Sequence, residues 1–180
     1  MRIISGSCRG RKLFKLQGQQ IRPTSDRIRE AVFNILGQKV RKARVLDLFA
    51  GTGALGIEAL SRGAEHTTFI DRNCDIIHQN LNLCRFEKNA TVICCDIVET
   101  SLSESLNRQQ FDLVFIDPPY GKGYIEQTLK KESFTDLVNE NGIIIAEHSY
   151  KESLQIALPG IDIYRQKKYS KTIISFINKK

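Results

Sequence analysis

The sequence has little of what a metal site, a disulfide scaffold or a membrane span requires. Its three histidines are scattered, and no apolar run approaches the roughly 18 residues that cross a bilayer. Its five cysteines are an odd number without a CxxC pair, which argues against a disulfide framework and against a zinc site. The start, MRIISGSCRGRKLF, lacks the apolar stretch of a secretory signal. We therefore expect a reduced, cytoplasmic protein with no metal and no membrane contact.

Acidic residues are scarce in the first quarter of the chain. Residues 1–44 contain 12 Lys and Arg against 2 Asp and Glu, a local net charge of +10. Residues 45–180 contain 15 against 18, a net charge of −3. A basic arm on a mildly acidic body indicates a polyanionic partner, most simply a nucleic acid. A basic face that serves only solubility is the alternative.

The first part of this single domain, residues 1–40, predicts a basic hairpin followed by a helix. Two short strands are expected around a glycine-containing turn. The helix then begins with Thr24 or Ser25 as its cap. Arg27 and Arg29 lie off its apolar stripe, so we expect one side of this helix to be buried and the other to be basic.

The remainder, residues 43–180, alternates short apolar strands with helices and predicts an α/β catalytic core. The expected strands are Val45–Phe49, Thr67–Ile70, Thr91–Cys95, Leu113–Ile116, Ile143–Ala146, Ile161–Lys167 and Thr172–Ile177. The expected helices are Ala54–Ser61, Cys74–Arg85 and Ile125–Lys131, with a less regular one around Ser101–Leu106. Several strands are apolar throughout, as in parallel sheets covered on both faces. The last two strands have no helix between them and predict an antiparallel hairpin at the sheet edge.

A glycine-rich turn follows the first of these strands directly. Residues 45–56, VLDLFAGTGALG, contain GxGxxG between a strand and a helix. The glycines allow a tight turn and let a ligand approach bare backbone. Asp71 ends the next strand, 20 residues after Gly51, where a carboxylate can accept both ribose hydroxyls. The pattern predicts an adenosine-type ligand at the strand ends.

Acidic residues near the turn distinguish between candidate ligands. Asp47 comes just before the turn, where it would repel the pyrophosphate of a dinucleotide. S-adenosylmethionine carries an ammonium and a sulfonium, so nearby carboxylates favour its binding. Asp96, after the third strand, could accept a hydrogen bond from an adenine amino group. The sequence therefore favours S-adenosylmethionine over a nicotinamide dinucleotide.

A second motif, Asp117-Pro-Pro-Tyr120, ends another apolar strand at the edge where ligands bind in open α/β sheets. The exocyclic amine of a base is a poor nucleophile because its lone pair is delocalised into the ring. If the Asp117 carboxylate and the Pro118 carbonyl accepted its two N–H groups, they would orient the nitrogen and localise that lone pair. Tyr120 could stack on the base. The motif predicts amino-group methylation.

The DPPY motif looks like that of amino-group methyltransferases acting on nucleic-acid bases. The whole chain resembles, over nearly its full length, the bacterial 16S rRNA guanine-N2 methyltransferases of the small ribosomal subunit. The resemblance rests on RIISG and RGRK near the start, on RPTSDR and REAVFN, on LDLFAGTGALGIEAL and on DPPY. Ser5 and Ser170-Lys171 depart from it, since glycine is expected in both turns.

The resemblance implies a Rossmann-like, seven-stranded, S-adenosylmethionine-dependent methyltransferase fold and methylation of N2 of guanine 966 in 16S rRNA. The implied cofactor-binding residues are Asp47, Gly51, Thr52, Gly53, Asp71, Arg72, Asp96 and Ile97. The implied catalytic residues are Asp117, Pro118, Pro119 and Tyr120. The residues expected to contact RNA are Arg9, Arg11, Lys12, Arg22, Arg27 and Arg29.

The target guanine must leave its stack before its amine can reach a buried methyl donor. A protein this small is not expected to select one guanine from naked sequence. We therefore expect it to act, as a monomer, on folded rRNA in a partly assembled small subunit.

Three other functions are consistent with parts of the sequence. A DNA adenine-N6 methyltransferase shares the DPPY motif, but the chain has no target-recognition insertion. A catalytically silent RNA-binding module would use the glycine turn only structurally. A nicotinamide-dependent oxidoreductase gives the DPPY motif no role and places Asp47 unfavourably.

Overall fold

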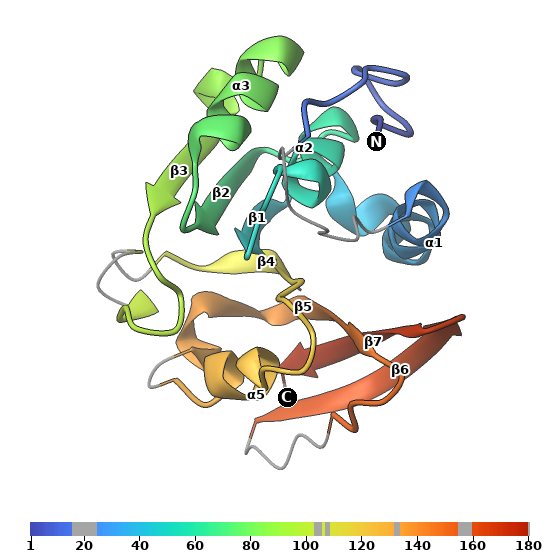
Figure 1. The fold of residues 1–180 in the computed structure, drawn as a ribbon, viewed down its shortest axis with the longest axis vertical. Helices are drawn as coiled ribbons and strands as arrows, with labels where there is room; N and C mark the ends of the chain where they lie inside the picture. The colour runs from blue at the N-terminus through green and yellow to red at the C-terminus, as the bar shows by residue number, and fades with distance from the viewer. Residues whose placement is uncertain (16–24, 103–105, 107–108, 132–133, 155–159, 180) are drawn as a thin grey trace.

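The computed structural model describes residues 1–15, 25–102, 106, 109–131, 134–154 and 160–179. Its centre is a seven-stranded sheet in the order β3-β2-β1-β4-β5-β7-β6 (Figure 1). The strands are β1 (Arg44–Leu48), β2 (His66–Asp71), β3 (Ala90–Cys94), β4 (Phe111–Ile116), β5 (Val138–Ser149), β6 (Ile161–Tyr169) and β7 (Thr172–Lys179). The strands β1 to β5 pair in parallel, whereas β7 is antiparallel to β5 and β6 is antiparallel to β7. The predicted Rossmann-like methyltransferase fold is confirmed.

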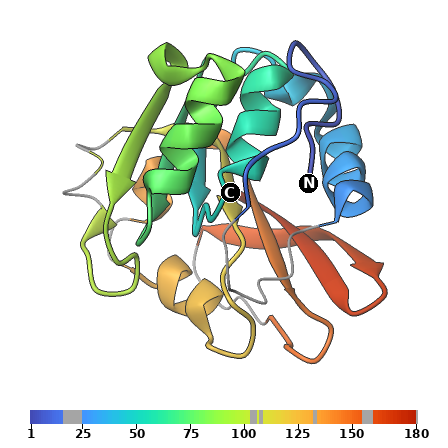
Figure 2. The ribbon, with the colours of Figure 1, turned by 45° about the horizontal axis from the view of Figure 1, so that its top comes forward.

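Helices cover both faces of the sheet. The longer ones, α1 (Asp26–Leu36), α2 (Ala54–Ser61) and α3 (Asp75–Cys84), pack on one face, and α5 (Tyr124–Leu129) packs on the other (Figure 2). Short 3₁₀ turns lie at Gly37–Val40, Glu87–Asn89 and Thr135–Leu137. The helix expected around residues 101–106 lies largely outside the described residues. In the part of the chain that is described, no helix is long and apolar enough to span a membrane.

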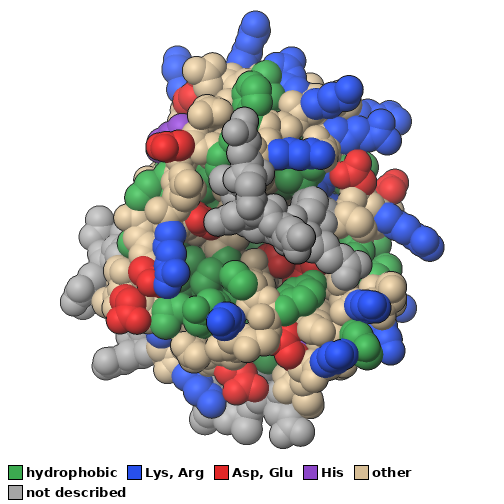
Figure 3. All heavy atoms as spheres, viewed as in Figure 1, with side chains coloured by type: hydrophobic (Ala, Val, Ile, Leu, Met, Phe, Trp, Pro, Cys, Tyr) green, Lys and Arg blue, Asp and Glu red, His purple; other side chains and the backbone are tan. Residues whose placement is uncertain are grey.

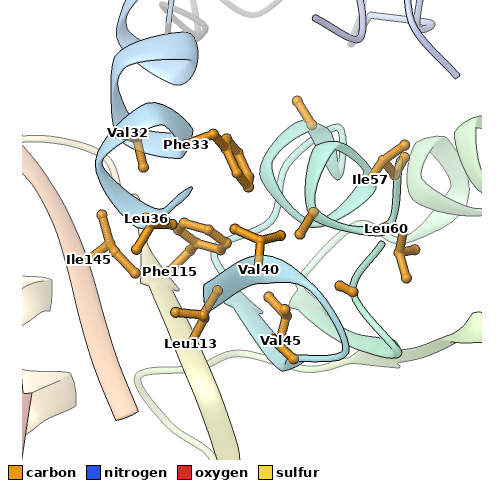
Figure 4. Packing of buried hydrophobic residues seen from close by; sticks show 14 of the residues in the cluster. Val32, Phe33, Leu36, Val40, Val45, Ile57, Leu60, Leu113, Phe115 and Ile145 are labelled. Carbon is orange, nitrogen blue, oxygen red and sulfur yellow. The ribbon is translucent and has the colours of Figure 1, made fainter. Parts of the chain in front are cut away.

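The packing under α1 shows why this helix forms where it does. Val32, Phe33 and Leu36 point from the helix towards Phe115 and its neighbours on β4 and β5 (Figure 4). The Phe33 and Phe115 ring centroids are 5.7 Å apart. The hydroxyl oxygen of Ser25 accepts a hydrogen bond from the first turn and thereby caps the helix, whereas Thr24 lies outside the described residues. The apolar face of α1 therefore attaches the N-terminal part of the chain to the sheet.

The N-terminal segment forms a loop that turns back on itself instead of two full strands. One antiparallel bridge joins Arg2 to Lys12. The Ile3 N–H donates to the Arg11 carbonyl at 2.9 Å, and the Gly10 N–H donates to the Ile3 carbonyl at 2.8 Å. The chain follows the predicted hairpin, but its strand pairing is reduced to this single bridge. Much of the segment forms hydrogen bonds with residues of helices α2 and α3 instead.

The expectation of fully reduced cysteines is wrong at one place. The structure joins Cys74 to Cys94 in a disulfide with a Cα–Cα distance of 5.8 Å. Cys94 pairs in register with Asp71 on the neighbouring strand, and Cys74 follows that strand by three residues. The two cysteines therefore come together through strand pairing, which a count of cysteines and their spacing does not reveal.

Candidate active site

The turn between β1 and α2 depends on its glycines. Gly51 and Gly53 have φ values of +56° and +76°, which L-residues with side chains rarely adopt. A Cβ atom on Gly51 would have no neighbour closer than 4.0 Å, so the backbone is accessible on that side. Gly56 acts differently, because a Cβ atom there would lie 2.3 Å from the Phe69 ring. It lets α2 pack directly on β2.

Asp47 lies beneath this turn. Its side chain is buried, and its carboxylate accepts a hydrogen bond from the Gly56 N–H at 2.8 Å. Burial raises the pKa of Asp47 to about 8, although the Gly56 N–H opposes the shift. From the sequence we expect Asp47 to favour a cofactor that carries an ammonium and a sulfonium. Its carboxyl group points towards α2, where it holds the helix against the end of β1, and its part in cofactor binding stays a prediction.

Asp71 ties the end of β2 to the same turn. One carboxylate oxygen accepts from the Gly51 N–H at 2.8 Å, and the other accepts from the Asn73 N–H at 3.0 Å. An ionised carboxylate has about four acceptor positions. The side chain can therefore position the glycine turn and still accept ribose hydroxyls.

Asp96 and Arg72 form an exposed pair at the neighbouring strand ends. The Arg72 guanidinium donates to the Asp96 carboxylate, and this hydrogen bond lowers the pKa of Asp96. Asp96 also accepts from the Val98 N–H at 2.9 Å. Ile97, by contrast, is 2% exposed and packs in the core. With its side chain in the core, Ile97 would bind the cofactor through its backbone, and this contact stays a prediction.

These residues fit S-adenosylmethionine. Gly51 offers accessible backbone in a left-handed conformation, and Asp71 and Asp96 supply carboxylates at successive strand ends. Carboxylates match the ammonium, the sulfonium and the ribose hydroxyls of this cofactor, and they would repel a pyrophosphate.

Asn80 is a buried residue that sequence reasoning missed. Its amide nitrogen donates to the Thr52 carbonyl at 2.9 Å, and its amide oxygen accepts from the Phe14 N–H at 2.8 Å. It therefore joins the glycine turn to the N-terminal segment. The only available signal was a polar residue within the apolar pattern of α3.

The DPPY motif begins directly after β4. Asp117 and Tyr120 are half-buried, Pro118 is buried and Pro119 is exposed. The motif borders a cavity of about 310 Å³, whose lining includes Pro118, Pro119, Tyr120, Tyr124 and Glu147. This volume lies at the lower end of the range for small-ligand pockets. The Phe49 ring of the glycine turn stacks on Tyr124, with centroids 5.8 Å apart, so the turn and the cavity adjoin.

The hydroxyl of Tyr120 is fixed by two side chains. It donates to a Glu147 carboxylate oxygen at 2.8 Å and lies 3.2 Å from the Thr172 hydroxyl. Burial, and after it the negative charge of Glu147, raises the pKa of Tyr120, so the phenol remains protonated. Sequence reasoning missed Glu147, although an acidic residue directly after the apolar run of β5 was a usable signal.

The basic residues expected to contact RNA divide into three groups. Arg9, Arg11, Lys12 and Arg27 are exposed, whereas Arg22 lies outside the described residues. Lys and Arg side chains gather over the end of the molecule that carries the N-terminal segment (Figure 3). Among the described residues of this set, the exposed ones are placed to meet a phosphate backbone.

Arg29 corrects the expectation, because its side chain is fully buried. Its guanidinium donates to the Arg2 carbonyl and to Asp26, and it lies 4.0 Å from the Glu58 carboxylate. Glu58 in turn accepts the Ile4 N–H at 2.7 Å. Arg29 therefore connects α1 to the N-terminal segment. The side of α1 that we expected to be basic is thus buried at this residue.

Among the described residues, no three His, Cys, Asp or Glu side chains gather as metal ligands do. The acidic side chains of the site are instead engaged with backbone N–H groups, with Arg72 or with Tyr120.

Residues 1–178 match the family model described as Conserved hypothetical protein 95. Ribosomal RNA small subunit methyltransferase D of Haemophilus influenzae is 35% identical over 156 residues, which cover 82% of this chain and 78% of that protein. The chain belongs to the methyltransferase D family. YlbH of Bacillus subtilis is 37% identical, with 100% of both chains covered. The solved structure of yhhF from Escherichia coli has a TM-score of 0.83 at 31% identity and covers 100% of this chain and 98% of that chain. The match to the family model thus includes the N-terminal segment.

Proposed function

We propose that this protein transfers a methyl group from S-adenosylmethionine to N2 of guanine 966 in 16S rRNA. The coarser activity, methylation of rRNA, is that of its family. One observation carries the finer proposal. Leu48, before the glycine turn, and Ile116, before the DPPY motif, are register partners on adjacent parallel strands. The methyl donor and the target amine would therefore meet at one edge of the sheet.

In this mechanism the DPPY motif acts on the amine. The Asp117 carboxylate and the Pro118 carbonyl accept its two N–H groups, which orients the nitrogen and localises its lone pair. Pro118 and Pro119 have no N–H groups that could compete for these acceptors. When bound, S-adenosylmethionine would supply a methyl group: the amine nitrogen would bond to the methyl carbon as its bond to the sulfonium sulfur breaks, S-adenosylhomocysteine would leave, and the amine would lose a proton to water. The turn around Gly51, together with Asp71 and Asp96, would hold this cofactor.

The test is nucleoside mass spectrometry of small-subunit RNA after incubation with the protein and labelled S-adenosylmethionine. We expect labelled N2-methylguanosine, lost in Asp117→Ala and retained in Asp136→Ala, an exposed aspartate outside the site. Labelled methyladenosine would move the target to an adenine. Absence of label from DNA and from rRNA, both deproteinised and in partly assembled small subunits, despite cofactor binding, would refute the proposed methylation.

The substrate we propose is a partly assembled small subunit, with phosphate contacts from Arg9, Arg11 and Lys12. Such a small surface supports recognition of folded RNA more than of sequence alone. If deproteinised rRNA is methylated as fast as an assembly intermediate, this part of the proposal is wrong.

We propose further that the protein acts as a cytoplasmic monomer. The edge strand β6 carries Arg165, Lys167 and Lys168, and lysine-rich edges disfavour strand pairing between molecules. Sedimentation equilibrium should then give the mass of one chain, 20.5 kDa. A dimer mass would contradict it.

A further inference from the structure

Glu147 stands beside the reactive motif because two strands are adjacent. Ile116 of β4 and Ala146 of β5 are register partners, so Asp117 and Glu147 are the next residues on neighbouring parallel strands. Such strands lie about 4.8 Å apart. The residues that carry these two carboxylates are therefore neighbours at the end of the sheet that borders the cavity.

The Glu147 side chain is held in place. It is 7% exposed, lines the cavity and accepts the Tyr120 hydroxyl at 2.8 Å, and that hydroxyl also contacts Thr172. Placing a carboxylate in so buried a position is costly unless hydrogen-bond donors surround it. An ionised carboxylate has about four acceptor positions and no donor, so this fixed group recognises only hydrogen-bond donors.

The chemistry of the bases indicates what Glu147 would recognise. The Watson–Crick edge of guanine presents adjacent donors, N1–H and the N2 amine. Adenine presents an amine donor beside N1, which is an acceptor. A fixed carboxylate next to the amine site therefore attracts N1–H of guanine and repels N1 of adenine.

We propose that Glu147 selects guanine by accepting a hydrogen bond from its N1–H while Asp117 and Pro118 hold the N2 amine. This inference rests on the proposed function and adds the residue that determines the base. Sites built to hydrogen-bond one polar group strongly reject analogues that lack it, because the buried partner is then left unpaired.

The decisive substrate is small-subunit RNA with 2-aminopurine in place of the target guanine. This base keeps the 2-amino group but has a lone pair where guanine has N1–H. For the unmodified protein we expect kcat/KM to be roughly 10- to 100-fold lower on 2-aminopurine than on guanine. In Glu147→Gln an amide N–H can donate to N1, while the amide oxygen can still accept from Tyr120. We expect this variant to lose activity on guanine and to gain relative activity on 2-aminopurine.

Glu152→Gln is the matched control. Glu152 also lines the cavity, but it accepts from the Gly121 and Ser149 N–H groups. Its substitution should leave the ratio between the two substrates unchanged, whatever its effect on total activity.

The outcomes separate the two proposals. If the unmodified protein fails to methylate guanine N2, the proposed function fails. If it methylates guanine but Glu147→Gln lowers the activity on both substrates equally, Glu147 only positions Tyr120 and this inference is overturned. If the variant transfers no methyl group, the two RNAs are made to compete for binding to it at equilibrium. The fluorescence of 2-aminopurine rises when the base leaves its stack, so it reports how much of that RNA is bound in the site. A shift of preference towards 2-aminopurine supports the inference, and an unchanged preference overturns it.

Discussion

At the scale of single residues, carboxylates in this protein hold backbone segments in place. Asp47 accepts an N–H of helix α2, Asp71 one of the glycine turn and Glu58 one of the N-terminal segment. Hydrogen bonds from backbone N–H groups to an ionised carboxylate are among the stronger ones in proteins, whereas Asp47, whose pKa is raised to about 8, accepts mainly as a neutral carboxylic acid at pH 7. Replacing such a residue therefore changes the geometry of a loop as well as the local charge.

Asp47 makes the stability of the protein depend on pH. Its pKa is about 8 in the folded protein, against the model value of 3.8, so the folded state binds a proton that the unfolded state releases. This contribution to stability is complete below about pH 4 and is lost as the pH rises through about 8. We expect the free energy of unfolding, from urea titrations, to fall between about pH 5 and about pH 8. Asp47→Asn should remove this part of the decrease, since its amide oxygen can still accept from Gly56. An identical pH dependence in the variant would contradict the assignment.

The chemistry of the site was more predictable than the orientation of its side chains. The motifs placed Asp71 and Asp117 correctly at strand ends, because the carboxyl ends of parallel strands meet at one edge. The direction in which Asp47 points and the burial of Arg29 were not predictable. Both depend on the packing of α2 and of the N-terminal segment, which are separate in sequence from the residues that they cover.

At the scale of elements, Asn80 on α3 connects two segments that are distant in sequence. We expect Asn80→Ala to weaken S-adenosylmethionine binding roughly 5-fold, because a net hydrogen bond is worth about 1 kcal/mol and the Thr52 carbonyl loses its partner. Isothermal titration calorimetry measures this change. Asn82→Ala, an exposed residue of the same helix, is the control and should bind as the unmodified protein does. Equal affinity in all three proteins would show that the contact does not support the turn.

The β6–β7 hairpin turns through Ser170 and Lys171, and Ser170 has a φ of +55°. Glycine is preferred at such positions because a Cβ atom is strained there. We expect Ser170→Gly to raise the free energy of unfolding by roughly 0.5–1 kcal/mol. Lys171→Gly, at a position without positive φ, should lower it. Thermal unfolding of both variants tests the pair, and a loss of stability in Ser170→Gly would contradict the explanation.

Helices and parallel strands were predictable because their apolar periodicity is strong. The hairpin of β6 and β7 was predicted as well, but not the pairing of its second strand, β7, with β5. The two N-terminal strands were overpredicted. Their alternating pattern is real, but the backbone there bonds to Glu58 and Ser61 on α2 as well as to itself.

At the scale of the whole molecule, the exposed basic segment and the reaction site lie at opposite ends of α2 and α3. The Ser7 N–H donates to the carbonyl of Ser61, the last residue of α2, and Arg11 contacts the Leu83 carbonyl near the end of α3. Both helices begin at the edge of the sheet that carries the glycine turn. The 8 residues of α2 separate the two regions by roughly 12 Å.

If this basic segment contacts RNA phosphates, the affinity for RNA will fall as the salt concentration rises. We expect Lys12→Gln to weaken binding similarly for all RNA sequences and to reduce the slope of log K against log salt by about 0.7–0.9. Lys130→Gln, at the residue that follows α5 on the other face of the sheet, is the control and should leave the slope unchanged. Filter binding at several salt concentrations measures both. Equal slopes for Lys12→Gln and the unmodified protein would remove Lys12 from the interface.

The length of α2 also sets a minimum size for the substrate. Stacked nucleotides advance about 3.4 Å each, so roughly three or four of them separate a phosphate at the basic segment from the reacting guanine. If Arg9 and Lys12 bind phosphates, a shorter oligonucleotide would occupy the site without reaching them. The shortest RNA that is methylated efficiently would then depend on the dimensions of the fold as well as on the target base.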